Sequence, residues 1–268
     1  MPQFEMMEAR PGIHIAFDRH VPANADRQKP GFLWLGGFKS DMTGTKAERL
    51  MDLAREADRL FIRFDYSGHG ASEGRFEDGT LTSWLAEACM ILGLADDRPM
   101  ILIGSSMGGF LALLVARMKI GRIAGLVLVA PAADMTELMA AEIAANPQAR
   151  AALERNGMWL RPSRYGDPYP ITRKLIEDGA KHLILGGGID LRCPLRILHG
   201  DQDPDVPWQH GLKTFAAIRS PDAQFTLIKD GDHRLSRDRD IMAIHRAAEE
   251  LAANYAGKEA SNDASPSR

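Results

Sequence analysis

The sequence predicts an α/β protein with a mostly parallel central sheet and helices on both faces. Short apolar runs alternate along the chain with helical segments of about 10 to 15 residues, which is typical of parallel strands connected by helices. Turn-forming residues follow several of the apolar runs directly, as expected where buried strands end. With 268 residues, 45% of them apolar, the chain is long enough to bury a large core.

The elements follow from the periodicity of the apolar residues. Residues 12–18 alternate apolar and polar side chains, which predicts an antiparallel edge strand. Short continuous apolar runs predict buried strands, and longer periodic segments predict helices. The predicted strands cover residues 32–35, 60–64, 100–103, 125–130, 195–198 and 224–229. The predicted helices cover residues 43–57, 81–95, 110–118, 208–218 and 238–255.

The alternation of strands and helices is interrupted after Pro131. Residues 132–192 are helical in composition at first and then rich in Pro, Arg, Tyr and Gly. An insertion of this size between two sheet strands is expected to form a lid over the strand ends, where ligands bind in open α/β sheets. We therefore expect a core of residues 1–131 and 193–256, a lid or cap at 132–192, and a small, polar, disordered tail at 257–268.

Composition and charge argue against several classes of partner. The net charge of −3 gives no support to nucleic acid or an anionic membrane as a partner. No run approaches the length of a membrane span, and the N-terminus lacks a secretory or transit pattern. The two cysteines, Cys89 and Cys193, lack metal-type spacing and fit a reducing compartment, so we expect a cytoplasmic protein. Composition does not indicate the oligomeric state.

The strand predicted at 100–103 ends in a motif that can carry chemistry. Residues 104–108 read Gly-Ser-Ser-Met-Gly, which is a G-x-S-x-G pattern between a strand and a helix. At such a turn the central serine is held in a strained backbone conformation that lifts its hydroxyl above the sheet, and the glycines let strand and helix pass closely. This pattern predicts Ser106 as a nucleophile, although the pentapeptide alone equally fits a plain β–α turn.

A serine nucleophile needs a base, and the base needs an orienting acid. The strand at 195–198 leads into an acidic loop, and the strand at 224–229 leads into Asp-Gly-Asp-His, which ends at His233. Both candidate side chains leave the same carboxyl edge of the sheet as the serine, in the chain order Ser, Asp, His. The sequence therefore predicts a catalytic triad of Ser106, Asp203 and His233.

The acid of this triad has alternatives. Asp203 stands four residues after His199 in an H-G-x-x-D-x-x-V-P pattern, whereas Asp201 and Asp205 also fit solvated turn positions. Asp205 therefore stays open as an alternative acid, and so does Asp134, which follows the preceding buried strand.

Catalysis by acyl transfer also needs two donors aimed at the oxyanion. The first is expected to be the backbone N–H of Met107, directly after the nucleophile. The second is expected from the turn after the strand at 32–35, at the N–H of Phe38, where Gly36 and Gly37 let the backbone approach the substrate closely. The alternative is a simple turn without this role.

The remaining histidines and glycines do not predict a cofactor. His199 and His69 are expected to be structural, and the glycines around His69 have the wrong spacing for a dinucleotide loop. No H-E-x-x-H, C-x-x-C or P-loop pattern occurs, so we expect neither a metal nor a nucleotide cofactor.

Two stretches outside the triad are more specific than G-x-S-x-G. Residues 39–47 read Lys-Ser-Asp-Met-Thr-Gly-Thr-Lys-Ala, and residues 62–68 read Ile-Arg-Phe-Asp-Tyr-Ser-Gly. With the elbow, the acid loop and the Asp-His-Arg at 232–234, the chain resembles the α/β-hydrolase superfamily over nearly its whole length. Within it, the chain resembles the abhydrolase-domain palmitoyl-protein thioesterase and acyl-glucuronide esterase family. One departure is the Gly-Gly at 36–37, where Pro-Gly is expected.

The resemblance implies an α/β-hydrolase fold with the same three catalytic positions and no cofactor. It also implies hydrolysis of carboxylic esters or acyl thioesters, and we expect an apolar acyl group and an acyl-enzyme on Ser106. The alternatives are a short-chain carboxylesterase or amidase and a non-catalytic scaffold of the same fold. A haloalkane- or epoxide-cleaving enzyme would need a carboxylate at position 106.

The predicted lid is basic between residues 155 and 174. Its cationic residues are Arg155, Arg161, Arg164, Arg173 and Lys174, set against the single acid Asp167. This stretch fits a solvated basic surface. The sharper hypothesis is that an arginine such as Arg164 pairs with a carboxylate of the substrate, beside an aromatic wall formed by Trp159, Tyr165 and Tyr169.

Overall fold

The computed structural model describes residues 4–23, 27–119, 121–163 and 166–263, with side chains described as far as residue 256. Its centre is an eight-stranded sheet of order β1-β2-β4-β3-β5-β6-β10-β12. The strands β1 and β2 pair antiparallel, β2 pairs antiparallel with β4, and the remaining pairs are parallel. The strands are β1 (Glu5–Arg10), β2 (Ile13–His20), β3 (Gly31–Leu35), β4 (Phe61–Phe64), β5 (Met100–Ser105), β6 (Ile123–Val129), β10 (Leu195–Gly200) and β12 (Ala223–Ile228).

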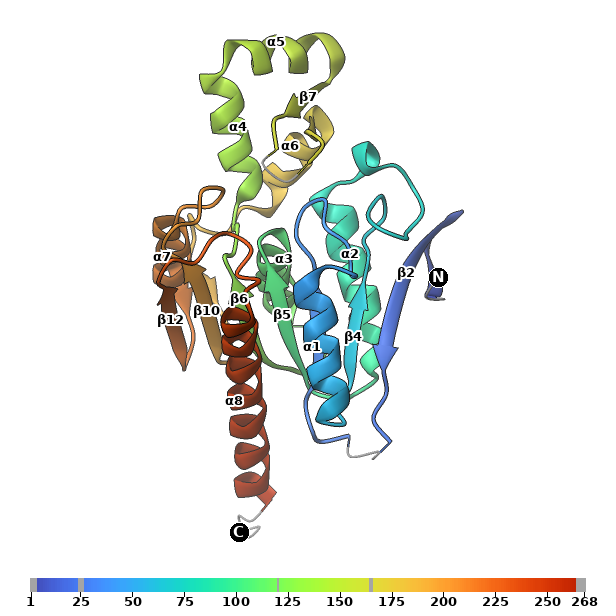
Figure 1. Ribbon diagram of the computed structural model, residues 1–268, viewed down its shortest axis with the longest axis vertical. Helices are drawn as coiled ribbons and strands as arrows, with labels where there is room; N and C mark the ends of the chain where they lie inside the picture. Colours follow the sequence, from blue (N-terminus) through green and yellow to red (C-terminus); the bar gives the residue numbers. More distant parts are fainter. Residues whose placement is uncertain (1–3, 24–26, 120, 164–165, 264–268) are drawn as a thin grey trace.

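Helices cover both faces of this sheet (Figure 1). The helices α1 and α8 pack on one face, while α2, α3 and α7 pack on the other. Successive residues of β5 project to opposite faces, so Leu102 joins one core cluster and Ile101 and Ile103 join the other. The predicted α/β class is confirmed. The helices are α1 (Thr45–Glu56), α2 (Leu81–Leu92), α3 (Met107–Met118), α7 (Trp208–Ala217) and α8 (Asp238–Asp263).

The strand predicted at the edge of the sheet is the second strand from the edge. Residues 13–20 pair with β4 on one side and with β1 on the other, so β1 is the edge strand. The sequence of β1, Glu-Met-Met-Glu-Ala-Arg, does not alternate between apolar and polar residues, and periodicity could not identify it.

The residues between β6 and β10 form an insertion of mixed structure rather than a helical one. Figure 1 shows α4, α5 and α6 beyond the end of the sheet at which β6 leads into α4. A hairpin of β7 and β8 lies between α5 and α6 and was not foreseen, because its strands are short. The elements are α4 (Met135–Ala145), α5 (Pro147–Asn156), β7 (Met158–Arg161), β8 (Tyr169–Thr172), α6 (Arg173–Gly179) and the two-residue β9 (Ile189–Asp190), which pairs with β11 (Ile218–Arg219).

Hydrogen bonds fasten this insertion to the sheet domain. The Asp178 carboxylate accepts the backbone N–H and the hydroxyl of Thr82, each at 2.8 Å, at the first turn of α2. Within the insertion itself, the Asp134 carboxylate accepts the N–H groups of Ile184 and Leu185 at 2.8 and 3.0 Å, which joins its beginning to its end. The division of the chain into core and lid stays a prediction, but any movement of α6 has to break the contacts with Thr82.

The C-terminal helix is longer than expected. The helix α8 continues to Asp263, so the disordered tail predicted from residue 257 is wrong for 257–263, and residues 264–268 lie outside the described part. Residues 258–260, Lys-Glu-Ala, are good helix formers, and an existing helix extends at little cost through such residues. Within the described ranges, no helix combines the length and apolar character needed to span a bilayer.

Candidate active site

The G-x-S-x-G motif forms a sharp turn between β5 and α3. Ser106 has φ 53° and ψ −114°, a conformation that L-residues rarely adopt. The flanking glycines are required by close approach, because a Cβ at Gly104 would lie 2.3 Å from the Gly108 carbonyl oxygen. A Cβ at Gly108 would lie 2.0 Å from the carbonyl oxygen of Leu35. The elbow therefore lies directly against the end of β3.

Replacing Gly108 by alanine is expected to destabilise the protein by about 3 kcal/mol or more, because the added Cβ overlaps backbone that cannot move away. Urea unfolding measures this loss. The matched control is Gly93→Ala, where φ is −60° and no atom lies within 4 Å of the added Cβ. This control should stay within about 0.5 kcal/mol of wild type. Equal stability of the two variants would contradict the steric argument.

The structure brings the three predicted triad side chains together. His233 Nε2 lies 3.1 Å from Ser106 Oγ, and His233 Nδ1 lies 2.8 Å from Asp203 Oδ2. Because a carboxylate only accepts, Nδ1 carries the proton, which leaves Nε2 free to accept the serine hydroxyl. The three residues follow the carboxyl ends of β5, β10 and β12. These strands lie in the order β5-β6-β10-β12, so their carboxyl ends are close together in the sheet.

Asp203 is held as a carboxylate by donors on both oxygens. Oδ1 accepts the backbone N–H groups of Asp205 and Val206, each at 2.9 Å, and Oδ2 accepts His233 and His199. Its side chain is fully buried. Burial alone would raise the pKa of Asp203, but the hydrogen bonds from His199 and His233 outweigh it and hold the pKa well below its ordinary value.

His199 makes a second contact with the acid that the sequence analysis did not foresee. Its Nε2 lies 3.1 Å from Asp203 Oδ2 and 2.9 Å from the Val206 carbonyl oxygen, and both are acceptors, so Nε2 carries the proton. The ring is fully buried, and Nδ1 packs on Gly211, where a Cβ would lie 2.2 Å away. His199 and His233 thus both donate to Oδ2 of Asp203, and His199 helps to orient this carboxylate.

The alternative acids lie in other environments. Asp205 lines the active-site cavity, and its backbone N–H donates to Asp203. Asp134 accepts the N–H groups of Ile184 and Leu185 inside the insertion. The carboxylate of Asp201 pairs with Lys229 at 2.9 Å. The hydrogen bond to His233 therefore distinguishes Asp203 from the other acids near the strand ends.

The two expected oxyanion donors flank the nucleophile. Met107 begins α3, so its N–H points out of the helix start without an intrahelical acceptor. A Cβ at Gly37 would lie 3.5 Å from both Ser105 O and Ser106 Cβ, which places the turn after β3 against the elbow. Within the described part of the chain, neither the N–H of Met107 nor that of Phe38 donates to a protein acceptor.

A cavity of about 490 Å³ opens above Ser106 and His233. Its apolar wall comes from the turn after β3, the insertion and the acid loop. Its apolar lining residues include Phe38, Ala132, Met135, Leu138, Met139, Tyr169 and Val206. Polar and charged side chains, among them Lys39, Lys46, Glu142, Arg161, Asp167 and Asp205, also line the cavity, so it offers both apolar and polar contacts to a bound substrate.

The residues of the insertion that were expected to contact the substrate lie in different places. Arg164 and Tyr165 lie outside the described residues. Trp159 is not part of the cavity lining, because β7 turns it into the core opposite Ile171. Arg161 does line the cavity and pairs with Glu142 of α4 at 3.0 Å.

Lys46 is a cavity residue that the sequence analysis did not single out. It lies in the first turn of α1, and its Nζ donates to the Arg234 carbonyl oxygen and to Ser236 Oγ. Burial, and to a lesser extent the charge of Arg234, lowers the pKa of Lys46 to about 8. The side chain therefore ties α1 to the loop that carries His233. The sequence feature that could have indicated a role for Lys46 is its position in the specific stretch 39–47.

One group of side chains near the site has metal-type spacing. Ligand atoms of Asp203, Asp205 and His233 lie within 4.8 Å of one another. However, His233 Nδ1 donates a hydrogen bond to Asp203, and each Asp203 oxygen already accepts two hydrogen bonds. A metal would have to displace these donors, so we interpret the group as a hydrogen-bonded unit.

The sequence profile of the alpha/beta hydrolase family matches residues 30–253. The chain belongs to the alpha/beta hydrolase family. Among relatives in this family, palmitoyl-protein thioesterase ABHD10, mitochondrial, of Mus musculus is 36% identical over 216 residues, which cover 79% of this chain and 71% of the mouse protein.

Solved structures of alpha/beta hydrolases share the whole architecture. A hydrolase from Agrobacterium vitis S4 has 40% identity and a TM-score of 0.88, covering 93% of this chain and 98% of that chain. Alpha/beta hydrolase domain-containing protein 10 from mouse has 31% identity and a TM-score of 0.80, covering 94% of this chain and 99% of that chain. These findings confirm both the α/β-hydrolase fold and the family resemblance expected from the sequence.

Proposed function

We propose that this alpha/beta hydrolase is a serine hydrolase that cleaves carboxylic esters or acyl thioesters through an acyl-enzyme on Ser106. The observation that carries the proposal is the position of His233, with Nε2 at 3.1 Å from Ser106 Oγ and Nδ1 at 2.8 Å from Asp203 Oδ2. A nucleophile, a base and an orienting acid in this geometry perform acyl transfer on several unrelated folds.

The first half of the reaction transfers the acyl group to the enzyme. His233 Nε2 takes the proton of Ser106 as Oγ attacks the carbonyl carbon, and the negative charge of Asp203 stabilises the imidazolium that forms. The N–H groups of Phe38 and Met107 stabilise the oxyanion. His233 then gives the proton to the leaving oxygen or sulfur, and the bond from the carbonyl carbon to that atom breaks.

The second half of the reaction returns the enzyme to its starting state. His233 removes a proton from water, whose oxygen attacks the acyl carbon and forms a second tetrahedral intermediate. Collapse of this intermediate breaks the bond to Ser106 Oγ, which regains its proton from His233. The product is a carboxylic acid.

The acyl group is proposed to be apolar. The side chains of Met135, Leu138 and Met139, all from α4, line the cavity that contains Ser106. The mouse relative is named a palmitoyl-protein thioesterase, which supports an aliphatic acyl group and a thioester as one form of the substrate. The hypothesis that Arg164 binds a substrate carboxylate stays a prediction.

We also propose that the protein works in a reducing compartment and that residues 132–192 form a lid on the sheet domain. Cys89 and Cys193 are both free thiols, which supports a reducing compartment such as the cytoplasm, whereas the mouse relative is named mitochondrial. Residues 132–192 are proposed to act as a lid, because residues of α4 and of the β7–β8 hairpin line the cavity.

A panel of p-nitrophenyl esters and acyl thioesters of graded chain length is expected to show hydrolysis that rises from acetyl to longer acyl groups. The reason is that each added methylene contributes about 0.8 kcal/mol when it is buried against the apolar wall. The measurement is kcat/KM for each chain length. A fluorophosphonate probe should label Ser106 in the same preparation.

Each rival reading predicts another result. A short-chain carboxylesterase loses kcat/KM as the chain lengthens, an amidase hydrolyses the matched anilides as fast as the esters, and a non-catalytic scaffold is not labelled by the fluorophosphonate. The matched control is Ser106→Ala, which keeps the cavity and removes the atom that reacts with the probe.

A further inference from the structure

The two specific stretches of sequence outside the triad contact each other. We call residues 36–42, which follow β3, the oxyanion loop, and residues 63–71, which begin in β4, the clamp segment. The clamp holds the loop at three points. Arg63 Nη1 donates to the Met42 carbonyl oxygen at 2.9 Å, Asp65 Oδ1 accepts the Met42 N–H at 2.6 Å, and His69 Nε2 accepts the Lys39 N–H at 3.1 Å.

The contact made by His69 lies next to the reacting centre. Lys39 directly follows Phe38, whose N–H is the proposed second oxyanion donor. Lys39 has φ 55°, a left-handed conformation that costs an L-residue about 1–2 kcal/mol. The loop therefore needs outside contacts to keep the Phe38 and Lys39 peptide units in this orientation. The acceptor at His69 supplies one of them.

The ring of His69 has one protonation state compatible with its contacts. It is 3% exposed, and its Nδ1 donates to the Ser67 carbonyl oxygen at 3.3 Å, so Nε2 is unprotonated and accepts from Lys39. Burial is the main reason that the pKa of His69 falls to about 4, and the charge of Lys39 lowers the pKa further. A neutral acceptor is therefore present throughout the neutral pH range.

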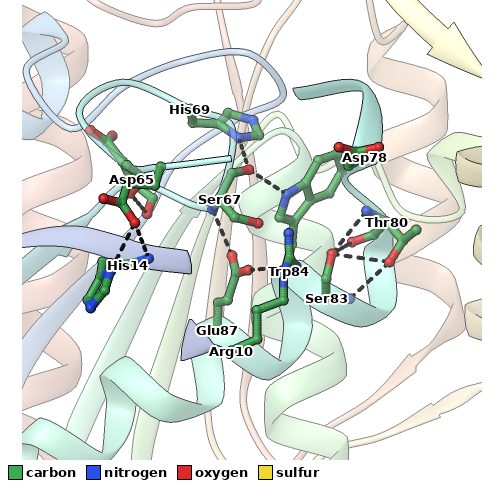
Figure 2. A network of polar contacts seen from close by, with 12 residues as sticks. Arg10, His14, Asp65, Ser67, His69, Asp78, Thr80, Ser83, Trp84 and Glu87 are labelled. Carbon is green, nitrogen blue, oxygen red and sulfur yellow. Dashed lines mark hydrogen bonds and ion pairs between the residues drawn. The ribbon is translucent and has the colours of Figure 1, made fainter. Parts of the chain in front are cut away.

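A buried network fixes the orientation of the ring (Figure 2). The carbonyl oxygen of Ser67 accepts hydrogen bonds from His69 Nδ1 and, at 3.2 Å, from Trp84 Nε1. The N–H of Ser67 donates to the Glu87 carboxylate at 2.9 Å. Arg10 lies 3.8 Å from Glu87. The His69 ring also packs edge-on against Trp84, with ring centres 5.2 Å apart. The ring cannot turn away from Lys39 without breaking these contacts.

We propose that His69 is a positioning residue for catalysis, whose Nε2 fixes the Lys39 N–H and thereby aims the N–H of Phe38 at the oxyanion. This inference rests on the proposed serine-hydrolase function and names a part of the machinery that the triad does not include. The specific stretches 39–47 and 62–68 also contact each other directly, through Arg63 and Asp65 at Met42, and His69, which directly follows the second stretch, adds the contact with Lys39 beside the donor.

The test compares His69→Phe with His69→Gln. Phenylalanine keeps a ring among the aromatic neighbours but has no acceptor, whereas the glutamine amide oxygen can reach the position of Nε2. We expect His69→Phe to lower kcat on a p-nitrophenyl ester by about 10- to 100-fold, since full loss of one oxyanion donor costs about 10²- to 10³-fold. KM should stay within about twofold, and His69→Gln should recover most of the lost kcat.

Two inhibitors separate positioning from a merely structural role. An alkyl trifluoromethyl ketone forms a tetrahedral adduct with Ser106 and needs the oxyanion donors, whereas the matched alkyl methyl ketone occupies the same cavity without them. His69→Phe should weaken the trifluoromethyl ketone in parallel with kcat and leave the methyl ketone unchanged. Urea unfolding checks that each variant is folded.

Each outcome is decisive. Unchanged kcat in folded His69→Phe, or equal weakening of both ketones, overturns the inference while the wild-type activity stands. Failure of the wild type to hydrolyse any ester and to react with a fluorophosphonate overturns the proposed function and the inference with it. A selective loss of the trifluoromethyl ketone, rescued in His69→Gln, supports both.

Discussion

Replacing Ser106 by alanine is expected to lower kcat/KM by about 10⁴- to 10⁶-fold while leaving the protein folded. Oγ is the atom that forms the covalent bond to the acyl group, and without it only binding and the oxyanion donors remain. The strained backbone at φ 53° comes from the turn and not from the hydroxyl, so alanine should adopt it equally well. The measurements are ester hydrolysis, fluorophosphonate labelling and urea unfolding.

The neighbouring serine provides the matched control. Ser105 ends β5 and is buried, and the hydroxyl that is hydrogen-bonded to His233 belongs to Ser106. Ser105→Ala should therefore keep activity within a few-fold of wild type and should still be labelled. If the two serine variants lose activity equally, the elbow acts through its backbone conformation and Ser106 is not the nucleophile.

The convergence of Ser106, Asp203 and His233 could be predicted because its signals are local. The residues that carry it each follow a short apolar run, and the carboxyl ends of parallel strands meet at one edge of the sheet. The sequence therefore placed Ser106, Asp203 and His233 in one region without knowledge of the order of the strands. The G-x-S-x-G turn also sets the conformation of Ser106 through steric contacts of its own glycines.

The supporting contacts could not be predicted because they depend on tertiary packing. His69 lies in a Gly-containing turn and His199 in β10, and nothing near them in sequence shows that one accepts from Lys39 and the other donates to Asp203. The oxyanion loop and the clamp segment are neighbours only because β3 and β4 pair in the sheet. The position of β1 and the β7–β8 hairpin were missed because short strands lack a clear period.

Replacing Asp203 by asparagine is expected to lower kcat by about 10⁴-fold, as loss of the orienting charge does in a serine triad. The geometry here is unusually strict, because four N–H groups point at the two oxygens. An asparagine with its oxygen toward the histidines turns its NH₂ against the N–H groups of Asp205 and Val206. The opposite orientation turns the NH₂ against His233 and His199. Either way two donors lose their acceptor, so stability should also fall, by about 1–3 kcal/mol or more in urea unfolding.

Asp205→Asn provides the control that decides the identity of the acid. Asp205 contributes its backbone N–H to Asp203, and this group is unchanged in the variant, so activity should stay within a few-fold of wild type. The low pKa of Asp203 adds a second check: its contribution to stability is present above the unfolded pKa of about 3.9 and is lost as the pH falls below it. The gain in unfolding free energy from pH 3 to pH 7 should therefore be smaller in Asp203→Asn than in Asp205→Asn. If Asp203→Asn keeps its activity and Asp205→Asn loses it, the histidine is oriented by the other carboxylate.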